Sequence, residues 1–367
     1  MHITEINIAR LTIPLIRPFI TAVRRTESVE DVVVMIKTDC GHIGYGSAAS
    51  TPAITGDSLD SIIAVIKDIL GPQLIGKEIS ELNSLLQMNN QAIAANTSAK
   101  AAIDIALHDL FAQQCGLPLY RLLGGNSNSM DSCITISVKA VDAMVQDAID
   151  LVNQGHHTIK IKLGLNPIDD IARVKAIRQA VGDTITLLVD ANQGWSYADA
   201  LMVINTFKQR HLNIPSVEQP VRAQDLHHLK AISEQVDCLI IADEACFSPE
   251  DALNIAKMKA CDGVNIKLMK SAGIENAQAI YDIAKAAQLK IMVGCMLESP
   301  IGIAAITSFA LSKPDILYAD LDPIFLIRDN YILGGAQRLG TQIVLPDKPG
   351  LGIEGVTRGL EPIGVIC

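Results

Sequence analysis

The sequence predicts an α/β protein built on a modified (β/α)8 barrel, with an α+β capping domain at its N-terminus that the C-terminal segment completes. Three observations lead to this fold class. In the first 120 residues a strand pattern is followed by a helix pattern. Eight short β-branched runs then alternate with amphipathic helices, and the last 45 residues are rich in Gly and Pro.

The N-terminal part, residues 1–120, is expected to form one small α+β domain. Residues 1–55 contain β-branched or alternating apolar runs, which indicate β-strands. The stretch 18–30 is polar and poorly patterned, so we expect a loop there. Residues 57–115 carry helical periodicity, and the Gly-Leu-Pro sequence at 116–118 is a helix stop. Strands followed by helices in this order suit a compact capping domain.

The next part, residues 121–322, predicts the barrel itself. Its eight β-branched runs begin roughly 20 to 30 residues apart, the length of one strand–helix unit. The runs are CITISV (133–138), HTIKIKL (157–163), ITLLVDA (185–191), SVEQP (216–220), CLIIADE (238–244), GVNIKL (263–268), KIMVGC (290–295) and ILYADLD (316–322). A doubly wound open sheet is the competing fold, but no glycine-rich phosphate turn follows the first run. Residues 323–367 would return to the capping domain.

Composition disfavours several functional classes. A net charge of −10 is unsuited to nucleic-acid binding, which needs clustered Lys and Arg. No stretch of about 18 residues is free of polar breaks, and the start has no basic segment before a long apolar run, so neither a membrane span nor secretion is expected. The eight cysteines form no Cys-x-x-Cys pair, and we expect reduced thiols in a cytoplasmic protein.

Three carboxylates come from the ends of adjacent predicted strands. Asp190, Glu218 and Asp243 lie at intervals of 28 and 25 residues. The carboxyl ends of barrel strands meet on one face, with neighbouring strands about 4.8 Å apart, so these side chains could converge. Unpaired, they would repel one another, which a divalent cation resolves. All-oxygen ligation favours Mg²⁺, and no histidine lies at these strand ends to suggest zinc. We expect one Mg²⁺ per subunit.

Two lysines are predicted to face each other across the barrel mouth. Lys162 ends the second predicted strand and Lys267 ends the sixth, four strands away in a barrel of eight. A substrate carboxylate held by the metal would place its α-carbon between them. One lysine could remove the α-proton and the other return a proton to the opposite face, while the metal stabilises the enediolate formed in between. Lys160, on the same face as Lys162, could lower the pKa of Lys162.

Asp320 and Asp322 end the eighth predicted strand, which lies opposite the fourth. They would sit across the pocket from the metal, and two carboxylates without a cation there suggest a substrate ammonium group. A molecule with a carboxylate at one end and an amine several bonds away is then expected. A dipeptide fits, whereas an α-amino acid is too short. The simpler alternative is that one of the two aspartates is structural.

Six segments, taken in order, resemble the muconate-lactonising subgroup of the enolase superfamily. They are KIKLG, VDANQGW, EQP, ADE, NIKLMKSAG and GCMLESPIG. The resemblance covers nearly the whole chain, including ITGDSLDSI in the capping part and CGLPLYRLLGG at the passage into the barrel. It implies Mg²⁺-dependent enediolate chemistry, with the metal triad on Asp190, Glu218 and Asp243 and the acid/base pair on Lys162 and Lys267.

Within that subgroup, the Asp-x-Asp sequence at 320–322 is similar to that of dipeptide epimerases, where it holds the substrate's ammonium group. The resemblance also places Thr135, Lys160 and Cys295 near the substrate. It therefore implies an isomerase that inverts the α-carbon of the C-terminal residue of a dipeptide.

The capping loop bears on the choice of dipeptide. Subgroup members that act on L-Ala-D/L-Glu carry an arginine in this loop to pair with the Glu side chain, and Arg24, or its neighbour Arg25, matches. Such a substrate would imply a role in recycling cell-wall peptides. Relatives often assemble as homo-oligomers, so a homo-oligomer is expected here too.

Other functions are also compatible with the sequence. An N-acylamino acid racemase, an o-succinylbenzoate synthase or a cycloisomerase would share the enediolate chemistry, but their substrates offer no ammonium group to Asp320 and Asp322. A non-catalytic, metal-dependent binding protein on the same fold is a further alternative, because fold does not determine function. The presence of both Lys162 and Lys267 argues against it.

Overall fold

The chain opens with a three-stranded antiparallel sheet. The computed structural model describes residues 1–21 and 25–367. β1 (Ile3–Ile20) pairs with β2 (Arg25–Thr38), which pairs in turn with β3 (Ile43–Ala49). The β-branched and aliphatic residues of these strands are mostly buried, which explains the strand pattern of the sequence.

The loop expected over residues 18–30 is wrong over most of its length. Phe19 pairs with Thr26 and Ile20 with Arg25, so β1 and β2 remain paired through these residues. The register shifts between Pro14 and Phe19. Side chains on both faces of this paired part are at least partly exposed, so no alternation marks these strands. Backbone pairing alone is sufficient, and polar residues can supply it.

Helices follow the first sheet, as predicted for residues 57–115. They are α1 (Leu59–Val65), its π-helical continuation η1 (Ile66–Leu70), the 3₁₀ turns η2 (Gly71–Gln73) and η3 (Ile79–Glu81), α2 (Leu82–Gln91), α3 (Thr97–Gln114) and α4 (Leu119–Leu122). α3 packs against β3 at backbone distance. A Cβ added at Gly46 would lie 1.9 Å from the carbonyl oxygen of Ala102, so only glycine allows this contact.

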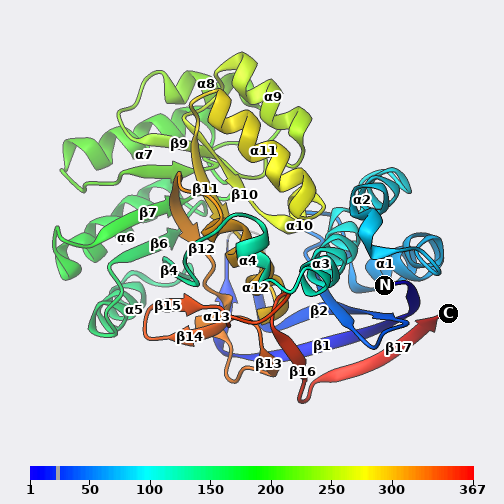
Figure 1. Cartoon of the computed structure of the whole chain (residues 1–367). Coiled ribbons are helices and arrows are strands. Elements are labelled where there is room, and N and C mark those ends of the chain that lie inside the picture. The colour runs from blue at the N-terminus through cyan, green and yellow to red at the C-terminus, as the bar shows by residue number, and fades with distance from the viewer. Residues whose placement is uncertain (22–24) are drawn as a thin grey trace.

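Eight parallel strands form the barrel, in the unbroken order β5 to β12. They are β5 (Ile134–Ile136), β6 (Thr158–Lys162), β7 (Thr186–Asp190), β8 (Ser216–Glu218), β9 (Leu239–Ala242), β10 (Gly263–Ile266), β11 (Lys290–Gly294) and β12 (Ile316–Asp320). The amide of Cys133 donates to the carbonyl of Ala319 at 2.8 Å, which brings the two ends of the sheet together. The predicted fold class is confirmed (Figure 1).

Helices surround the barrel on its outer side (Figure 1). They are α5 (Val141–Asn153), α6 (Pro167–Val181), α7 (Tyr197–Gln209), α8 (Leu226–Ser233), α9 (Pro249–Met258), α11 (Ile274–Ala286) and α12 (Pro300–Leu311). The one-turn helices α10 (Leu268–Ser271) and α13 (Pro323–Leu326) follow the carboxyl ends of β10 and β12. None of the helices in residues 1–21 and 25–367 is long and apolar enough to cross a membrane.

The C-terminal segment returns to the first sheet, as expected. Its strands are β13 (Ile332–Gly334), β14 (Gln337–Leu339), β15 (Gln342–Val344), β16 (Ile353–Val356) and β17 (Leu360–Ile366). β17 pairs antiparallel with β1 and gives a four-stranded sheet of order β17-β1-β2-β3. β15 pairs on one side with β14 and on the other with β4 (Ser129–Asp131), just before the barrel. The division into residues 1–120, 121–322 and 323–367 stays a prediction.

The end of β1 lies across the mouth of the barrel. The amide of Ile20 donates to Ser137 Oγ at 3.0 Å, and the amide of Val138 donates to the carbonyl of Ile20 at 3.1 Å. Both partners follow the end of β5. The capping sheet is thereby fixed to the face where the barrel strands end, which is the face that carries active sites in this fold.

Candidate active site

Strand register brings the first site residues side by side. Lys162 at the end of β6 is the register partner of Asp190 on β7, and Asp190 is the partner of Glu218 on β8. Asp243 follows β9 directly. All four side chains are buried, so the predicted convergence at the carboxyl ends of the strands is realised.

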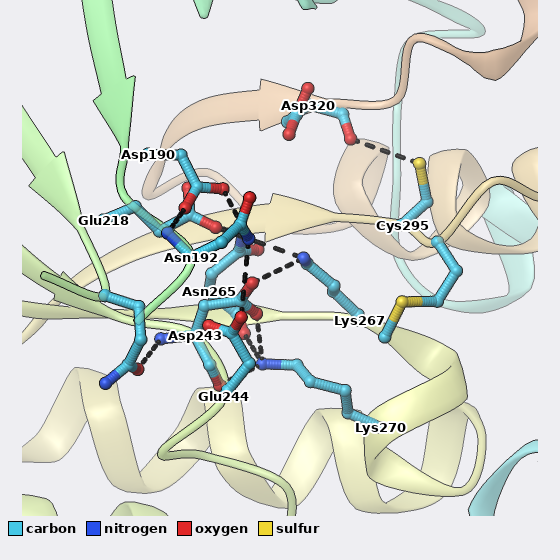
Figure 2. A network of polar contacts seen from close by, with 12 residues as sticks. Asp190, Asn192, Glu218, Asp243, Glu244, Asn265, Lys267, Lys270, Cys295 and Asp320 are labelled. Carbon is cyan, nitrogen blue, oxygen red and sulfur yellow. Dashed lines mark hydrogen bonds and ion pairs between the residues drawn. The ribbon is translucent and has the colours of Figure 1, made fainter. Parts of the chain in front are cut away.

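The three carboxylates form a cluster that suits a divalent cation. One oxygen from each of Asp190, Glu218 and Asp243 lies within 4.8 Å of the others, and the three side chains gather at the centre of the site (Figure 2). Among residues 1–21 and 25–367 this is the one group of three or more potential metal ligands at such spacing. Three carboxylate oxygens without nitrogen or sulfur suit a hard cation such as Mg²⁺.

The pKa values of the triad carboxyl groups are shifted in opposite directions. Burial alone would raise the pKa of Asp190, but the ammonium groups of Lys162 and Lys160 outweigh burial and lower it to about 2. Burial, with Asp190 close by, raises the pKa of Glu218 to about 8. Three negative charges therefore resist being held together unless cations compensate them. A bound Mg²⁺ would supply that compensation.

The two predicted bases lie on opposite sides of the barrel mouth. Lys162 is on β6 and Lys267 follows β10, four strands away in the sheet. Lys162 Nζ is 2.6 Å from Asp190 Oδ2, and Lys267 Nζ is 2.7 Å from Asp243 Oδ2. Both lysines line the same cavity. Burial would lower the pKa of Lys267, but Asp243 and Glu218 outweigh it and raise that pKa.

Lys160 lies beneath the site. Its side chain is completely buried, and it is absent from the described lining of the cavity that Lys162 and Lys267 share. Lys160 Nζ is 2.7 Å from Glu218 Oε2, 2.7 Å from Asp320 Oδ2 and 3.1 Å from Asp190 Oδ2. Asp320 was expected to lack a cationic partner within the protein, and that expectation is wrong, because the ammonium group of Lys160 pairs with it.

Asp322 is the less compensated of the two aspartates after β12. It accepts a hydrogen bond of 2.8 Å from the amide of Thr135, and burial, together with Asp320, raises the pKa of Asp322 to about 6. Asp320, Asp322, Thr135 and Cys295 all line the cavity. Cys295 Sγ lies 3.3 Å from the carbonyl oxygen of Asp320 and donates to it.

The capping domain supplies part of the same cavity. Phe19, Thr21 and Ile54 line it together with the barrel residues. Arg24, the predicted partner of a Glu side chain, lies outside the described residues. Arg25 is exposed, and its guanidinium group is 3.1 Å from a carboxylate oxygen of Glu27.

Three polar residues near the triad were not predicted. Asn265 Nδ2 donates to Glu218 Oε1 at 2.9 Å, and Gln219 Oε1 accepts from the amide of Asp243 at 2.9 Å. Lys270 Nζ is 2.7 Å from Asp243 Oδ1 and donates to the carbonyl oxygen of Asn265 at 2.9 Å. A signal was present for two of them, because Asn265 and Lys270 are interspersed with apolar residues in the same run as Lys267.

A second buried acidic pair joins the cap to the barrel. Asp31 of β2 accepts from the amide of Ser299 at 2.9 Å, and Glu298 accepts from the amide of Met296 at 2.8 Å. Burial raises the pKa of Asp31 to about 6 and that of Glu298 to about 8. Neither carboxylate is among the described residues lining the substrate cavity.

Comparison with known proteins agrees with this geometry. The family described as "Mandelate racemase / muconate lactonizing enzyme, N-terminal domain" matches residues 3–124, and the one described as "Enolase C-terminal domain-like" matches residues 143–357. The L-Ala-D/L-Glu epimerase of Clostridium acetobutylicum is 45% identical over 359 residues, which cover 98% of this chain and 100% of that protein.

Two solved structures share the whole architecture. The substrate-liganded L-Ala-D/L-Glu epimerase from Bacillus subtilis has a TM-score of 0.95 at 41% identity and covers 97% of this chain and 99% of its own. The dipeptide epimerase from Enterococcus faecalis, complexed with Mg and the dipeptide L-Leu-L-Tyr, has a TM-score of 0.92 at 38% identity, with 96% and 99% covered. The resemblance noted in the sequence is confirmed, and this chain belongs to the muconate-lactonising subgroup of the enolase superfamily.

Proposed function

We propose that this chain is a Mg²⁺-dependent dipeptide epimerase that inverts the α-carbon of the C-terminal residue by two-base proton transfer through an enediolate. The observation that carries the proposal is the pair Lys162 and Lys267, which line one cavity from opposite sides of the barrel beside a triad of carboxylates. Full-length relatives with dipeptide epimerase activity support it.

Asp190, Glu218 and Asp243 are the proposed ligands of one Mg²⁺. A Mg²⁺ ion held there would stabilise the negative charge that grows on the substrate carboxylate as the α-proton leaves. The fit is supported by the mutual distance of 4.8 Å or less between the carboxylate oxygens and by their burial, which makes a compensating cation favourable.

The lysines move the protons. A neutral amino group on one lysine accepts the α-proton, and the ammonium group of the other donates a proton to the opposite face, so Lys162 and Lys267 exchange charge states in each inversion. Each lysine can act as the base or as the acid, so the reverse reaction uses the same two groups in the opposite order. This accounts for inversion in either direction.

The far end of the cavity is the proposed site for the substrate ammonium group. Asp322 is the principal partner, because Lys160 already compensates Asp320. Thr135 holds Asp322 through its amide and, with Cys295, lines the dipeptide. Lys160 acts from below by keeping Asp320 and the triad in place.

L-Ala-D/L-Glu is the proposed substrate, with Arg24 pairing with the Glu side chain. A role in recycling cell-wall peptides in the cytoplasm, as a homo-oligomer, follows as part of the proposal. The eight free thiols are compatible with a reducing compartment. A hydrophobic dipeptide is the second candidate, because Phe19, Ile54 and Leu297 give the described cavity an apolar wall.

Deuterium exchange tests the proposal directly. The protein is incubated with L-Ala-D-Glu and Mg²⁺ in D₂O, and the Glu α-proton is followed by NMR together with the appearance of L-Ala-L-Glu. We expect deuterium at the α-carbon of both epimers. Absence of exchange with L-Ala-D-Glu and with a panel of L-Ala-Xaa dipeptides would contradict the proposed function.

Variants and alternative substrates separate the mechanism from the reaction class. The double variant Lys162→Ala, Lys267→Ala should abolish exchange, and exchange that survives in it would contradict the two-base mechanism. Turnover of N-succinylamino acids or of muconate in preference to every dipeptide would favour the related reactions of the same subgroup, since these substrates offer no ammonium group to Asp322.

A further inference from the structure

Asn265 is a completely buried asparagine that the proposed reaction does not use. It lies on β10, two residues before Lys267, and its side chain points toward the triad (Figure 2). Asn265 Nδ2 donates to Glu218 Oε1 at 2.9 Å, whereas its Oδ1 has no hydrogen-bond partner among the described residues. The unpaired buried acceptor has a desolvation cost of about 1–3 kcal/mol, and the hydrogen bond that the amide makes here is donated to Glu218.

The surroundings restrict this amide. A Cβ added at Gly294 on β11 would lie 2.8 Å from Asn265 Oδ1 and 2.9 Å from Nδ2, so the side chain rests against bare backbone. On the other side, Lys270 Nζ donates to the carbonyl oxygen of Asn265 at 2.9 Å and fixes the strand end. A donor held this firmly can orient its acceptor.

Glu218 is the carboxylate that needs such a hold. Its Oε2 is 2.7 Å from Lys160 Nζ, and its Oε1 accepts from Asn265, so the two oxygens are held by different strands. Without the amide, Oε1 would keep, among the described residues, only the ammonium group of Lys267, at 4.0 Å. The carboxylate plane of Glu218 would then be free to rotate, driven by repulsion from the other two carboxylates of the triad.

We propose that Asn265 is a positioning residue that sets the Mg²⁺ affinity of the site by holding Glu218 in its ligating orientation. The inference rests on the proposed function, because it takes Glu218 as a metal ligand. The hydrogen bond orients the Glu218 carboxylate when the chain folds, so less conformational entropy is lost when the metal binds. Residues that orient metal ligands typically change metal affinity by about 10- to 100-fold when replaced.

The experiment measures Mg²⁺ binding directly, by isothermal titration of the full chain after removal of divalent ions with EDTA and in the absence of substrate. Asn265→Leu keeps the size of the side chain and removes the donor. We expect its Kd for Mg²⁺ to rise by about 10- to 100-fold. We also expect kcat to recover at high Mg²⁺, a rescue that general damage to the fold would not show.

Asn89 offers a matched control. It is also buried, its Nδ2 donates one hydrogen bond, to the carbonyl oxygen of Lys100 at 3.0 Å, and its Oδ1 likewise has no partner among the described residues. It lies on α2 of the cap and touches no carboxylate of the triad. Asn89→Leu should leave the Kd for Mg²⁺ within about twofold of the original value.

The outcomes are distinguishable. A Kd for Asn265→Leu within the range of Asn89→Leu would overturn the inference while the proposed function stands. No Mg²⁺ binding by the unmodified chain would overturn both. Should the leucine prevent folding, Asn265→Ala removes the donor without adding bulk near Gly294, and the same rise in Kd is expected from it.

Discussion

Replacing Lys160 with methionine tests how much the barrel mouth depends on one buried cation. Methionine keeps much of the shape of the lysine chain and removes the ammonium group that lies within 3.1 Å of Asp190, Glu218 and Asp320. These carboxylates are buried, so water cannot take the place of the lost cation. Removing one partner from a buried ion pair lowers the free energy of unfolding by about 3–5 kcal/mol.

The size of the effect can be expressed as a shift in melting temperature. The entropy of unfolding is about 2.1 cal/mol/K per residue, or about 0.8 kcal/mol/K for a chain of 367 residues. A loss of about 4 kcal/mol therefore lowers Tm by about 5 °C. Differential scanning calorimetry in EDTA measures this shift. Added Mg²⁺ should reduce it, because the ion compensates two of the same carboxylates.

Lys100→Met is the control for that measurement. Lys100 is also buried, but its Nζ donates to the backbone carbonyl of Asn90 at 2.8 Å, and no carboxylate lies within ion-pair distance of it among the described residues. Its loss should lower the free energy of unfolding by about 1.5–3 kcal/mol, the range for one hydrogen bond from a charged group. A Tm for Lys160→Met no lower than that of Lys100→Met would refute the view that Lys160 holds the site together.

Three further predictions concern other parts of the molecule. Asp322→Asn keeps an acceptor oxygen but loses the charge, so kcat/KM for L-Ala-D-Glu should fall by about 10- to 100-fold, measured by polarimetry; unchanged turnover would contradict the ammonium site. Gly294→Ala places a Cβ 3.0 Å from Lys267 Cε and still closer to Asn265. It should lower both Tm and kcat, with a loss of stability of about 1–3 kcal/mol. Unchanged Tm and kcat would show that the backbone of β11 can move to make room for a methyl group. Burial raises the pKa of Glu298 from 4.5 to about 8, so the native state holds a proton that the unfolded chain releases, and stability should fall as pH rises through this window. Urea unfolding at pH 5 and pH 8 should show a loss of stability that is smaller by a few kcal/mol in Glu298→Gln than in the unmodified chain, and equal losses for the two proteins would contradict the assignment.

The sequence was most informative at the ends of the barrel strands. Ionisable residues at the ends of three successive apolar runs have few structural explanations, so Asp190, Glu218 and Asp243 could be found from their places at adjacent predicted strand ends. The opposition of Lys162 and Lys267 followed from counting strands. Both inferences depend on local pattern and on the closure of eight strands, which a sequence can reveal.

Contacts between segments far apart in the chain could not be predicted from local patterns or from counting strands. The pairing of Phe19 with Thr26 and of Ile20 with Arg25 is made by the backbone, which leaves no side-chain pattern. The pairing of Lys160 with Asp320 joins residues 160 positions apart, and each had a plausible role of its own. Lys270 satisfies backbone carbonyls of two strand ends, and such acceptors are invisible until the chain is folded.

The pairing of β17 with β1 has a consequence for synthesis on the ribosome. β1 can join β2 and β3 as soon as they emerge, but its other edge finds its partner only after Leu360–Ile366 have been made. During that interval the nascent chain carries an unprotected row of backbone amides and carbonyls, which is a template for pairing with the wrong strand. Deletion of the last strand should therefore increase aggregation during expression more than it lowers activity in the molecules that fold.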